Sequence, residues 1–121
     1  MPSGRIPDDL LTDDLTGWTT LQGSIDKTAY LACINALDTL FATPLAFTID
    51  SLTADDNRVV AEARSEGILS NGESYRNTYI FVFRIRDGRI AAIAEHYNAL
   101  TVHKKLIPLM TQPSASATNK P

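Results

Sequence analysis

Residues 59–98 read "VVAEARSEGILSNGESYRNTYIFVFRIRDGRIAAIAEHYN". This stretch is rich in β-branched and aromatic residues, which favour strands, and two glycine-containing pairs interrupt it. Those pairs, Asn71-Gly72 and Asp87-Gly88, are typical of tight hairpin turns. The sequence therefore predicts an antiparallel meander, with strands at about 58–69, 74–86 and 89–98.

The segment before the meander predicts a helix packed on the sheet. Apolar side chains recur at helical spacing over 30–41, and Pro44 is expected to end the helix. Ser24 is its expected N-cap. Short strands are expected at 15–21 and from Leu45 onward. This order of elements predicts an α+β fold in which a long helix packs on a curved antiparallel sheet.

The length of 121 residues and the apolar share of 44% predict one globular domain. Its expected bounds are 11–110. The polar arm 1–10 is expected to be flexible, and the low-complexity tail 111–121 is expected to be disordered. A short final helix within the domain is expected to stop at Pro108.

The composition argues against several classes of function. A net charge of −3 without a basic patch disfavours a nucleic-acid partner, and no apolar run is long enough for a membrane span. The single cysteine, Cys33, allows no internal disulfide, and with no secretory signal in view a cytoplasmic location is expected. His96 and His103 are seven residues apart, outside the usual metal-binding spacings, so no metal or other cofactor is expected.

Three charged residues share one face of the first meander strand: Glu62, Arg64 and Glu66. Such a row is either a solvent-exposed surface or the floor of a polar site inside a pocket. A two-residue turn before the next strand would pair the row with Asn77, Tyr79 and Phe81. Charged groups would then alternate with aromatic rings, which predicts that the row lines a small-molecule pocket.

The position of Glu95 depends on the second hairpin. A two-residue turn at Asp87-Gly88 would pair Glu95 with Ile80 and send it to the opposite face. A three-residue loop that also includes Arg86 would pair Glu95 with Tyr79, on the face of the charged row. One residue of register therefore decides whether Glu95 joins that row.

These features together resemble the second half of a SnoaL-like domain, in the nuclear transport factor 2-like or ketosteroid isomerase-like superfamily. The likeness is carried by Glu62, Gly67, the Asn-Gly turn, "YRNTYIFVFR", "DGRI" and Glu95. With "LLTDDLTGW" and the helix before "FTIDSLTADDNRVV", it covers about residues 10–100. It implies a cone-shaped pocket between the curved sheet and helices, open at one end, often in a homodimer. Family members usually have helices before the first strand, whereas only Met1–Leu10 precede it here. The cone is therefore expected to be open, to be filled by another segment or chain, or to lack an enclosed site.

The resemblance suggests three chemistries. Ketosteroid isomerases place aspartates at positions that fall near Thr19 and at Phe81 here, so that chemistry is not supported. Limonene-type epoxide hydrolases use two carboxylates around an arginine, and their set is similar to Arg64-Ser65-Glu66 with Glu95. This match requires the three-residue loop, which is therefore preferred. Polyketide cyclases of the SnoaL type use one carboxylate, a role open to Glu66 or Glu95.

The combined prediction is a cofactor-independent acid–base enzyme of isomerase, cyclase or epoxide hydrolase type. Its expected substrate is a small apolar oxygenated molecule such as a polyketide, terpenoid or steroid-like compound. The expected catalytic residues are Arg64, Glu66 and Glu95. The expected substrate-binding residues are Glu62, Ile68, Asn77, Tyr79, Phe81 and Tyr97. The alternative is a non-catalytic ligand-binding or dimerisation module with an open pocket.

The outer face of the predicted meander is apolar and carries Ile80, Val82, Ala92 and Ala94. No helix is expected to cover this face. Contiguous apolar surface is usually buried against a partner, so a homodimer through the outer sheet face is expected.

Overall fold

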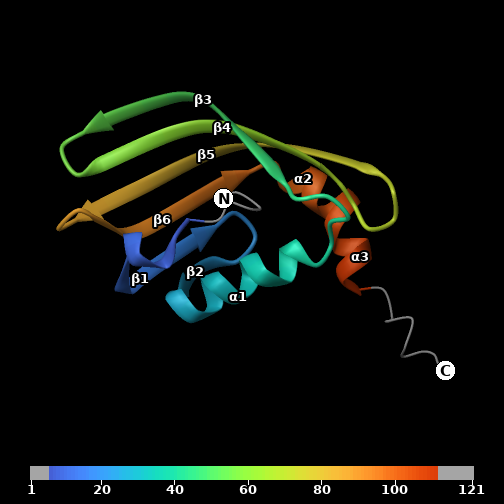
Figure 1. The fold of residues 1–121 in the computed structure, drawn as a ribbon, viewed down its shortest axis with the longest axis horizontal. Coiled ribbons are helices and arrows are strands. Elements are labelled where there is room, and N and C mark those ends of the chain that lie inside the picture. Colours follow the sequence, from blue (N-terminus) through green and yellow to red (C-terminus); the bar gives the residue numbers. More distant parts are fainter. Residues whose placement is uncertain (1–5, 112–121) are drawn as a thin grey trace.

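The computed structural model describes residues 6–111 and shows an α+β fold built on one six-stranded sheet (Figure 1). The strands lie in the order β2-β1-β6-β5-β4-β3. Their bounds are β1 Leu11–Thr19, β2 Gly23–Asp26, β3 Ala46–Asp55, β4 Arg58–Ile68, β5 Ser74–Arg86 and β6 Arg89–Tyr97. All neighbours are antiparallel except β1 and β6, which are parallel. The predicted α+β class is confirmed, with a mixed sheet in place of a purely antiparallel one.

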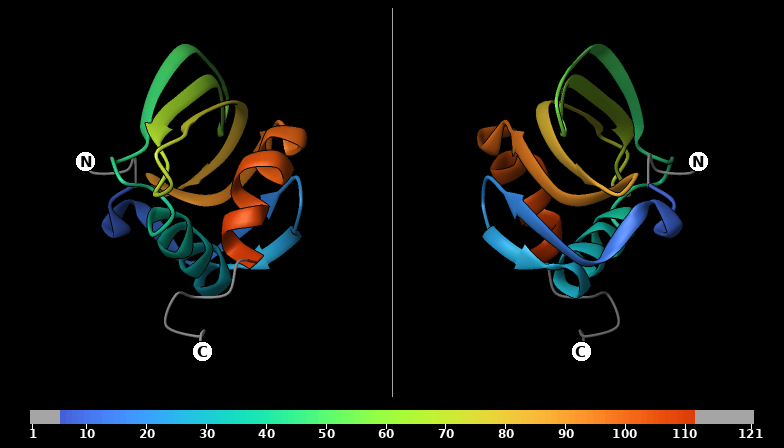
Figure 2. Two further views of the ribbon diagram at one scale, coloured as in Figure 1. Left: turned by 90° about the vertical axis from the view of Figure 1, so that its right-hand side faces the viewer. Right: turned by 90° about the vertical axis from the view of Figure 1, so that its left-hand side faces the viewer.

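The helices lie on one side and at one end of the sheet. Their bounds are η2 Asp8–Leu10, α1 Lys27–Asp38, α2 Ala99–Thr101, η3 Val102–Leu106 and α3 Ile107–Thr111, where η2 is a 3₁₀ turn and η3 is π-helical. Figure 1 shows β3 to β6 arched above α1, with the C-terminal helices at one end of the molecule. The two side views in Figure 2 show how strongly the sheet curls.

The predicted arm and tail lie partly outside the described residues, which exclude 1–5 and 112–121. Within the arm, Asp8–Leu10 form a 3₁₀ turn directly before β1. Across residues 6–111, no helix is long and apolar enough to cross a membrane.

α1 begins two residues later than the sequence predicts. Its N-cap is Asp26, whose side chain accepts a hydrogen bond from the Ala29 N–H at 2.8 Å. The predicted cap, Ser24, lies instead in β2, opposite Trp18 of β1. Serine and aspartate are comparable N-caps, so the extension of β2 decides between them.

The C-terminal helical run continues past Pro108, where the sequence predicts a stop. The turn before the proline, Val102–Leu106, is π-helical and therefore wider than an α-helical turn. A proline has no N–H to donate and crowds the preceding turn of an α-helix. Here the turn before Pro108 is widened, and the helical run continues through the proline to Thr111.

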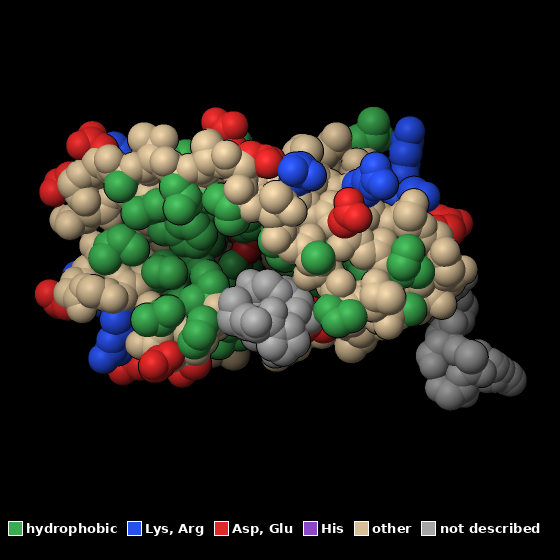
Figure 3. Space-filling model, turned by 45° about the horizontal axis from the view of Figure 1, so that its top comes forward, with side chains coloured by type: hydrophobic (Ala, Val, Ile, Leu, Met, Phe, Trp, Pro, Cys, Tyr) green, Lys and Arg blue, Asp and Glu red, His purple; other side chains and the backbone are tan. Residues whose placement is uncertain are grey.

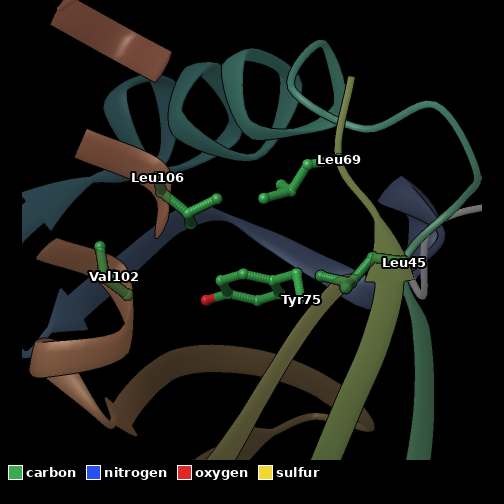
Figure 4. Packing of buried hydrophobic residues seen from close by; sticks show 5 residues of the cluster. All are labelled: Leu45, Leu69, Tyr75, Val102 and Leu106. Carbon is green, nitrogen blue, oxygen red and sulfur yellow. The ribbon is translucent and has the colours of Figure 1, made fainter. Parts of the chain in front are cut away.

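Two clusters of buried apolar side chains hold the sheet and helices together. The first attaches the C-terminal run to the sheet and contains Leu45, Leu69, Tyr75, Val102 and Leu106, as Figure 4 shows. The second lies between α1, β1 and β6 and contains Leu11, Leu15, Tyr30 and Ile93. Tyr30 is the member of the second cluster that carries a hydroxyl.

The hairpin between β4 and β5 has a three-residue loop, Ser70–Gly72, rather than the predicted two-residue turn. The Leu69 N–H donates to the Glu73 carbonyl at 2.8 Å, and Gly72 has a φ of +90°. A turn that ends in a left-handed glycine contains one residue more than the predicted turn. The pairing of the two strands is therefore shifted by one position.

This shift moves the charged row of β4 to the other face of the sheet. Arg64 pairs with Thr78 instead of Tyr79. The small residues between the charges are buried on the inner face: Ala61, Ala63 and Ser65. The row itself, with Glu62 and Glu66, is exposed on the outer face. The predicted register is wrong, because a slip of one residue reverses every side chain of a strand.

The hairpin between β5 and β6 has the two-residue turn, so the preferred three-residue loop is also wrong. Asp87 and Gly88 have φ values of +54° and +76°, as a type I′ turn requires. A β-bulge next to Arg84 then shifts the register, so that Glu95 pairs with Phe81. Glu95 therefore faces the aromatic side of the sheet, as predicted, but does so because of a bulge.

Candidate functional site

A cavity of about 240 Å³ lies between the inner face of the sheet and α1. Its apolar wall includes Leu31, Ile34 and Leu37 of α1 and Phe47, Phe83 and Ile93 of the sheet. The polar residues at its wall are Tyr30, Asp38, Tyr79 and Glu95. Figure 3 shows hydrophobic side chains gathered around a hollow. A mostly apolar wall with a few polar groups is the usual form of a small-molecule site.

Aromatic rings of β5 form one side of the cavity. Tyr79 and Phe81 are stacked with centroids 5.2 Å apart, and Phe81 and Phe83 are stacked at 5.8 Å. Phe47 of β3 packs against Tyr79 with the ring centroids 5.2 Å apart. Because alternate residues of a strand point to the same side, these rings make one continuous apolar surface.

The Glu95 carboxylate accepts a hydrogen bond from the Tyr30 hydroxyl. Glu95 comes from β6 and is partly buried, whereas Tyr30 comes from α1 and is 5% exposed. Gly17 of β1 makes room for the tyrosine ring, because a Cβ at Gly17 would lie 2.7 Å from Tyr30 Cδ1. Two strands and a helix thus bring a hydroxyl onto a carboxylate at the cavity wall.

Burial raises the pKa of Glu95 above the ordinary value of 4.5, and the hydrogen bond from Tyr30 opposes part of this rise. Burial, and then the nearby charge of Glu95, raise the pKa of Tyr30, so its hydroxyl stays protonated. Glu95 can therefore exchange a proton inside an apolar cavity while Tyr30 donates a hydrogen bond to it. These are the properties of a general acid or base.

The raised pKa of Glu95 predicts that stability depends on pH. The folded protein binds this proton more tightly than the unfolded chain, so the contribution is complete below about pH 4.5 and is lost as pH rises through the folded-state pKa. Glu95→Gln should lack this loss. Urea unfolding of both proteins between about pH 4 and 8 measures it, with the exposed Glu62→Gln as control. Parallel pH curves for the wild type and Glu95→Gln would contradict the raised pKa.

Asn77 is buried and links β5 to the start of α2. Its Oδ1 accepts hydrogen bonds from the N–H groups of Thr78 at 2.7 Å and Asn98 at 3.0 Å. Its Nδ2 donates to the Tyr75 hydroxyl at 2.8 Å and to the Asn98 carbonyl at 3.3 Å. The amide is therefore engaged inside the protein, and the predicted contact with a substrate does not fit this position.

The structure brings only some of the predicted site residues together. Glu95, Tyr79 and Phe81 line the cavity. The Tyr79 hydroxyl lies 2.7 Å from Ser65 Oγ in a buried contact, and burial raises the pKa of Tyr79. The hydroxyl is therefore engaged inside the protein, and the ring of Tyr79 is the part available to a ligand. Tyr97 accepts a hydrogen bond on its hydroxyl from the Leu21 N–H at 3.3 Å and does not line the cavity.

The remaining predicted residues do not line the cavity: Glu62, Arg64, Glu66 and Ile68. Arg64 is on the outer face, where its Nε donates to both carboxylate oxygens of Asp50 at 3.1 Å. The set of two acids around an arginine is therefore not assembled in the cavity, because the strand that carries Arg64 and Glu66 presents them to the opposite side.

Sequence reasoning missed the role of Tyr30, which it placed in the apolar stripe of the helix. One signal was present, since a buried tyrosine hydroxyl needs a hydrogen-bond partner. Glu95 was the matching group, because it is the only charged residue within the run "IAAIAEHY" of the last strand. The pair is separated by 65 residues along the chain, so no local pattern joins them.

The remaining soft ligands and acids form no further centre in the part of the chain that is described. Within residues 6–111, no three His, Cys, Asp or Glu side chains lie close enough together to hold a metal ion. Burial raises the pKa of the Cys33 thiol, whose Sγ donates to Gln22 Oε1 at 3.4 Å. A protonated thiol is a poor nucleophile, so Cys33 adds no reactive group to the cavity.

Comparison with known proteins relates this chain to a family. The SnoaL-like domain matches residues 7–93. The uncharacterized protein YesE of Bacillus subtilis (strain 168) is 41% identical over 51 residues, which are 41% of this chain and 35% of YesE. The alignment thus spans about a third of the length of that relative.

Solved structures agree with this match. A candidate isomerase from Bacillus subtilis has a TM-score of 0.69 and 27% identity, over 80% of this chain and 76% of that chain. An NTF2-like protein from Anabaena variabilis ATCC 29413 has a TM-score of 0.68 and 26% identity, over 74% and 70% of the two chains. With residues from β1 to the first half of β6 inside the matched range, the chain belongs to the SnoaL-like domain family and has the NTF2-like fold.

Proposed function

We propose that this protein is a cofactor-independent acid–base enzyme of isomerase or cyclase type for a small apolar molecule that carries a carbonyl group. The observation that carries the proposal is the Glu95 carboxylate, which the Tyr30 hydroxyl holds at the wall of an apolar cavity. A carboxyl group whose pKa is raised by burial suits proton transfer at neutral pH. The name of the Bacillus subtilis neighbour, a candidate isomerase, agrees with this class of reaction.

In the proposed reaction, Glu95 acts twice in each turnover. As a carboxylate it takes a proton from a carbon atom beside the substrate carbonyl, which becomes an enolate. The carboxyl group then returns the proton to a second atom of the same substrate. In a cyclisation, the enolate carbon first adds to a second carbonyl carbon of the substrate, the π bond of that carbonyl breaks, and the carboxyl group gives its proton to the resulting alkoxide oxygen. The Tyr30 hydroxyl stabilises the carboxylate by its hydrogen bond. The step consumes no oxidant or reductant, and Glu95 is regenerated.

The aromatic wall supplies binding and excludes water. Tyr79, Phe81 and Phe83 present stacked rings toward the cavity, and a substrate that covers them gains hydrophobic contact. Water exclusion strengthens the electrostatic effect of the carboxylate on a bound carbonyl compound. The cavity volume of about 240 Å³ favours a small substrate.

The make-up of the cavity wall also favours proton transfer over the predicted epoxide hydrolysis, because no arginine lies beside Glu95 in it. That reaction would need two acids on either side of an arginine, and Arg64 and Glu66 lie on the face opposite Glu95. Proton transfer within one substrate needs only one group that both accepts and returns a proton. Glu95 with Tyr30 meets this requirement.

A second candidate function is ligand binding or dimerisation without catalysis. Ile49 lines the cavity and is 51% exposed, and Leu52 of the same strand is 65% exposed. Leu52 pairs with Ala61, which faces inward, so Leu52 lies on the same side of the sheet as the cavity. Exposed apolar side chains beside an opening favour a ligand or another chain as their cover.

One experiment separates the two candidates. The protein is incubated in D₂O with a panel of apolar ketones, lactones and phenolic compounds, and NMR follows binding and the exchange of C–H groups next to the carbonyl. Exchange catalysed by the protein supports the enzyme. Binding at the cavity without exchange supports the binding module. If no compound shifts the Phe81 or Phe83 resonances, the cavity is not a site for these compounds, which contradicts both the enzyme and the ligand-binding module.

Tyr30→Phe is expected to raise the pKa of Glu95 further, because the hydrogen bond that lowers it is lost. Carboxyl ¹³C NMR of the labelled protein measures this pKa as a function of pH. Tyr97→Phe is the matched control, since its hydroxyl contacts the Leu21 N–H and not Glu95. An unchanged or lowered pKa in Tyr30→Phe would contradict the assigned hydrogen bond.

We also propose that the protein forms a homodimer through its outer sheet face. We propose in addition that it works without a cofactor and is located in the cytoplasm. Ile80 on this face is 40% exposed, and the paired Val82 and Ala94 are partly exposed beside it. Ile80→Asp should therefore shift the protein from dimer to monomer in sedimentation velocity. Leu100→Asp is the control, as Leu100 is equally apolar and 60% exposed but lies in α2. A monomeric wild type would contradict the proposal.

A further inference from the structure

Two residues of the charged row of β4, Arg64 and Glu66, line a second hollow, separate from the apolar cavity. This groove has a volume of about 260 Å³. Its polar wall includes Thr48, Arg64, Glu66, Arg76, Thr78 and Asn98. It lies where β3, β4 and β5 meet the start of α2, and no residue of the apolar cavity lines it. The proton transfer proposed for Glu95 makes no use of these residues.

The two arginines of the groove are close neighbours. Arg64 pairs with Thr78, and Arg76 is two residues before Thr78 on β5. Diagonal positions of this kind on adjacent strands lie roughly 7–8 Å apart, within reach of two long side chains. Both guanidinium groups can therefore contact one ligand in the groove.

Within residues 6–111, both guanidinium groups have unused hydrogen-bond donors. Arg64 uses its Nε for Asp50, and within residues 6–111 its terminal amino groups donate to no other residue. The Nε of Arg76 lies 4.0 Å from a Glu66 oxygen, which is too long for a hydrogen bond. In each pair the carboxylate approaches the Nε side. The terminal amino groups, which form the fork that binds oxyanions, stay available.

We propose that this groove binds the oxyanion group of a small polar molecule, a carboxylate or a phosphate, between Arg64 and Arg76. Each guanidinium offers planar donors to the anion, and the Thr48 and Thr78 hydroxyls at the same wall offer further hydrogen bonds. Asp50 orients Arg64 from the side. The proposal is independent of the chemistry at Glu95.

Simple surface ion pairs are the competing explanation for the row. The side chains of Arg64 and Arg76 are 57% and 79% exposed, and exposed pairs of this kind contribute little to stability. Ion pairing alone would need no concave surface. The groove, the hydroxyls around it and the unused guanidinium donors together favour a ligand site.

Protein NMR with two simple anions tests the site. ¹⁵N-labelled protein at neutral pH is titrated with inorganic phosphate and, in a second series, with succinate, while sodium chloride keeps the ionic strength constant. The backbone amides of Thr78 and Asn98 are expected to show saturable shifts. Saturation with phosphate alone identifies a phosphate-bearing ligand, and saturation with succinate alone identifies a carboxylate.

The double variant Arg64→Gln/Arg76→Gln should weaken this binding roughly tenfold or more, since charge-assisted hydrogen bonds are lost. Arg84→Gln is the matched control, because Arg84 is exposed on β5, the strand of Arg76, but lies outside the groove. Its affinity should equal that of the wild type. Shifts that do not saturate with either anion, or equal affinities in the double variant and the wild type, would overturn the proposal. Neither result would bear on Glu95.

Discussion

Replacing Glu95 with glutamine is expected to slow proton transfer to and from a substrate by about 10²–10⁴-fold, the usual contribution of a general acid or base. Glutamine has nearly the same shape and can still accept the hydrogen bond of the Tyr30 hydroxyl, but it cannot take up a proton. Substrate affinity should therefore change little. Single-turnover exchange in D₂O measures the rate, and a separate ligand titration measures the affinity.

The matched control for this prediction is Glu62→Gln, which removes an exposed carboxylate from the opposite face of the sheet. Its rate should equal that of the wild type. In the wild type, the rate of proton abstraction should rise with pH as Glu95 ionises, with a midpoint above 4.5 because burial raises this pKa. An undiminished rate in Glu95→Gln would exclude the assigned role.

Asn77→Ala is expected to lower the free energy of unfolding by about 2–4 kcal/mol, because several buried or partly buried groups lose their hydrogen-bond partner together. These groups are the N–H of Thr78, the N–H and carbonyl of Asn98 and the hydroxyl of Tyr75. The loss should also loosen the contact of α2 with β5. Urea unfolding measures the change, and hydrogen exchange at Asn98 locates it.

Asn35→Ala serves as the comparison for Asn77, since Asn35 is exposed on α1. Surface substitutions of this kind usually change stability by within about 0.5 kcal/mol. If Asn77 instead contacted a ligand, as the sequence predicts, Asn77→Ala would leave stability close to that of Asn35→Ala and would weaken ligand binding.

The strands of the meander were predictable because the signals that define them are local. β5 was predicted at 74–86 and is observed at Ser74–Arg86, and β4 and β6 each end within about one residue of the prediction. The alternation of aromatic residues in β5 also predicted a common face for Tyr79 and Phe81, which both line the cavity.

The face of the sheet on which each side chain lies was not predictable from such local signals. The Asn-Gly pair is compatible with a two-residue turn, but the left-handed Gly72 closes a three-residue loop and reverses Arg64 and Glu66. The loop is selected by what the reversal buries, namely the small residues of β4 in place of its charges. The bulge near Arg84 likewise sets the face of Glu95, because it shifts the register so that Glu95 pairs with Phe81. No local sequence motif predicts this bulge.

The sequence by itself determined the three strands of the meander, the presence of the helix before them and the family, because propensity, periodicity and turn residues act over a few positions. It did not predict β2 at Gly23–Asp26. Only the tertiary structure decided which side chains meet. The hydroxyl of Tyr30 reaches Glu95 across 65 residues, past a glycine at position 17 that leaves room for the ring. Such a pair depends on loop length, on one bulge and on the packing of a helix, and each of these is settled by contacts between distant parts of the chain.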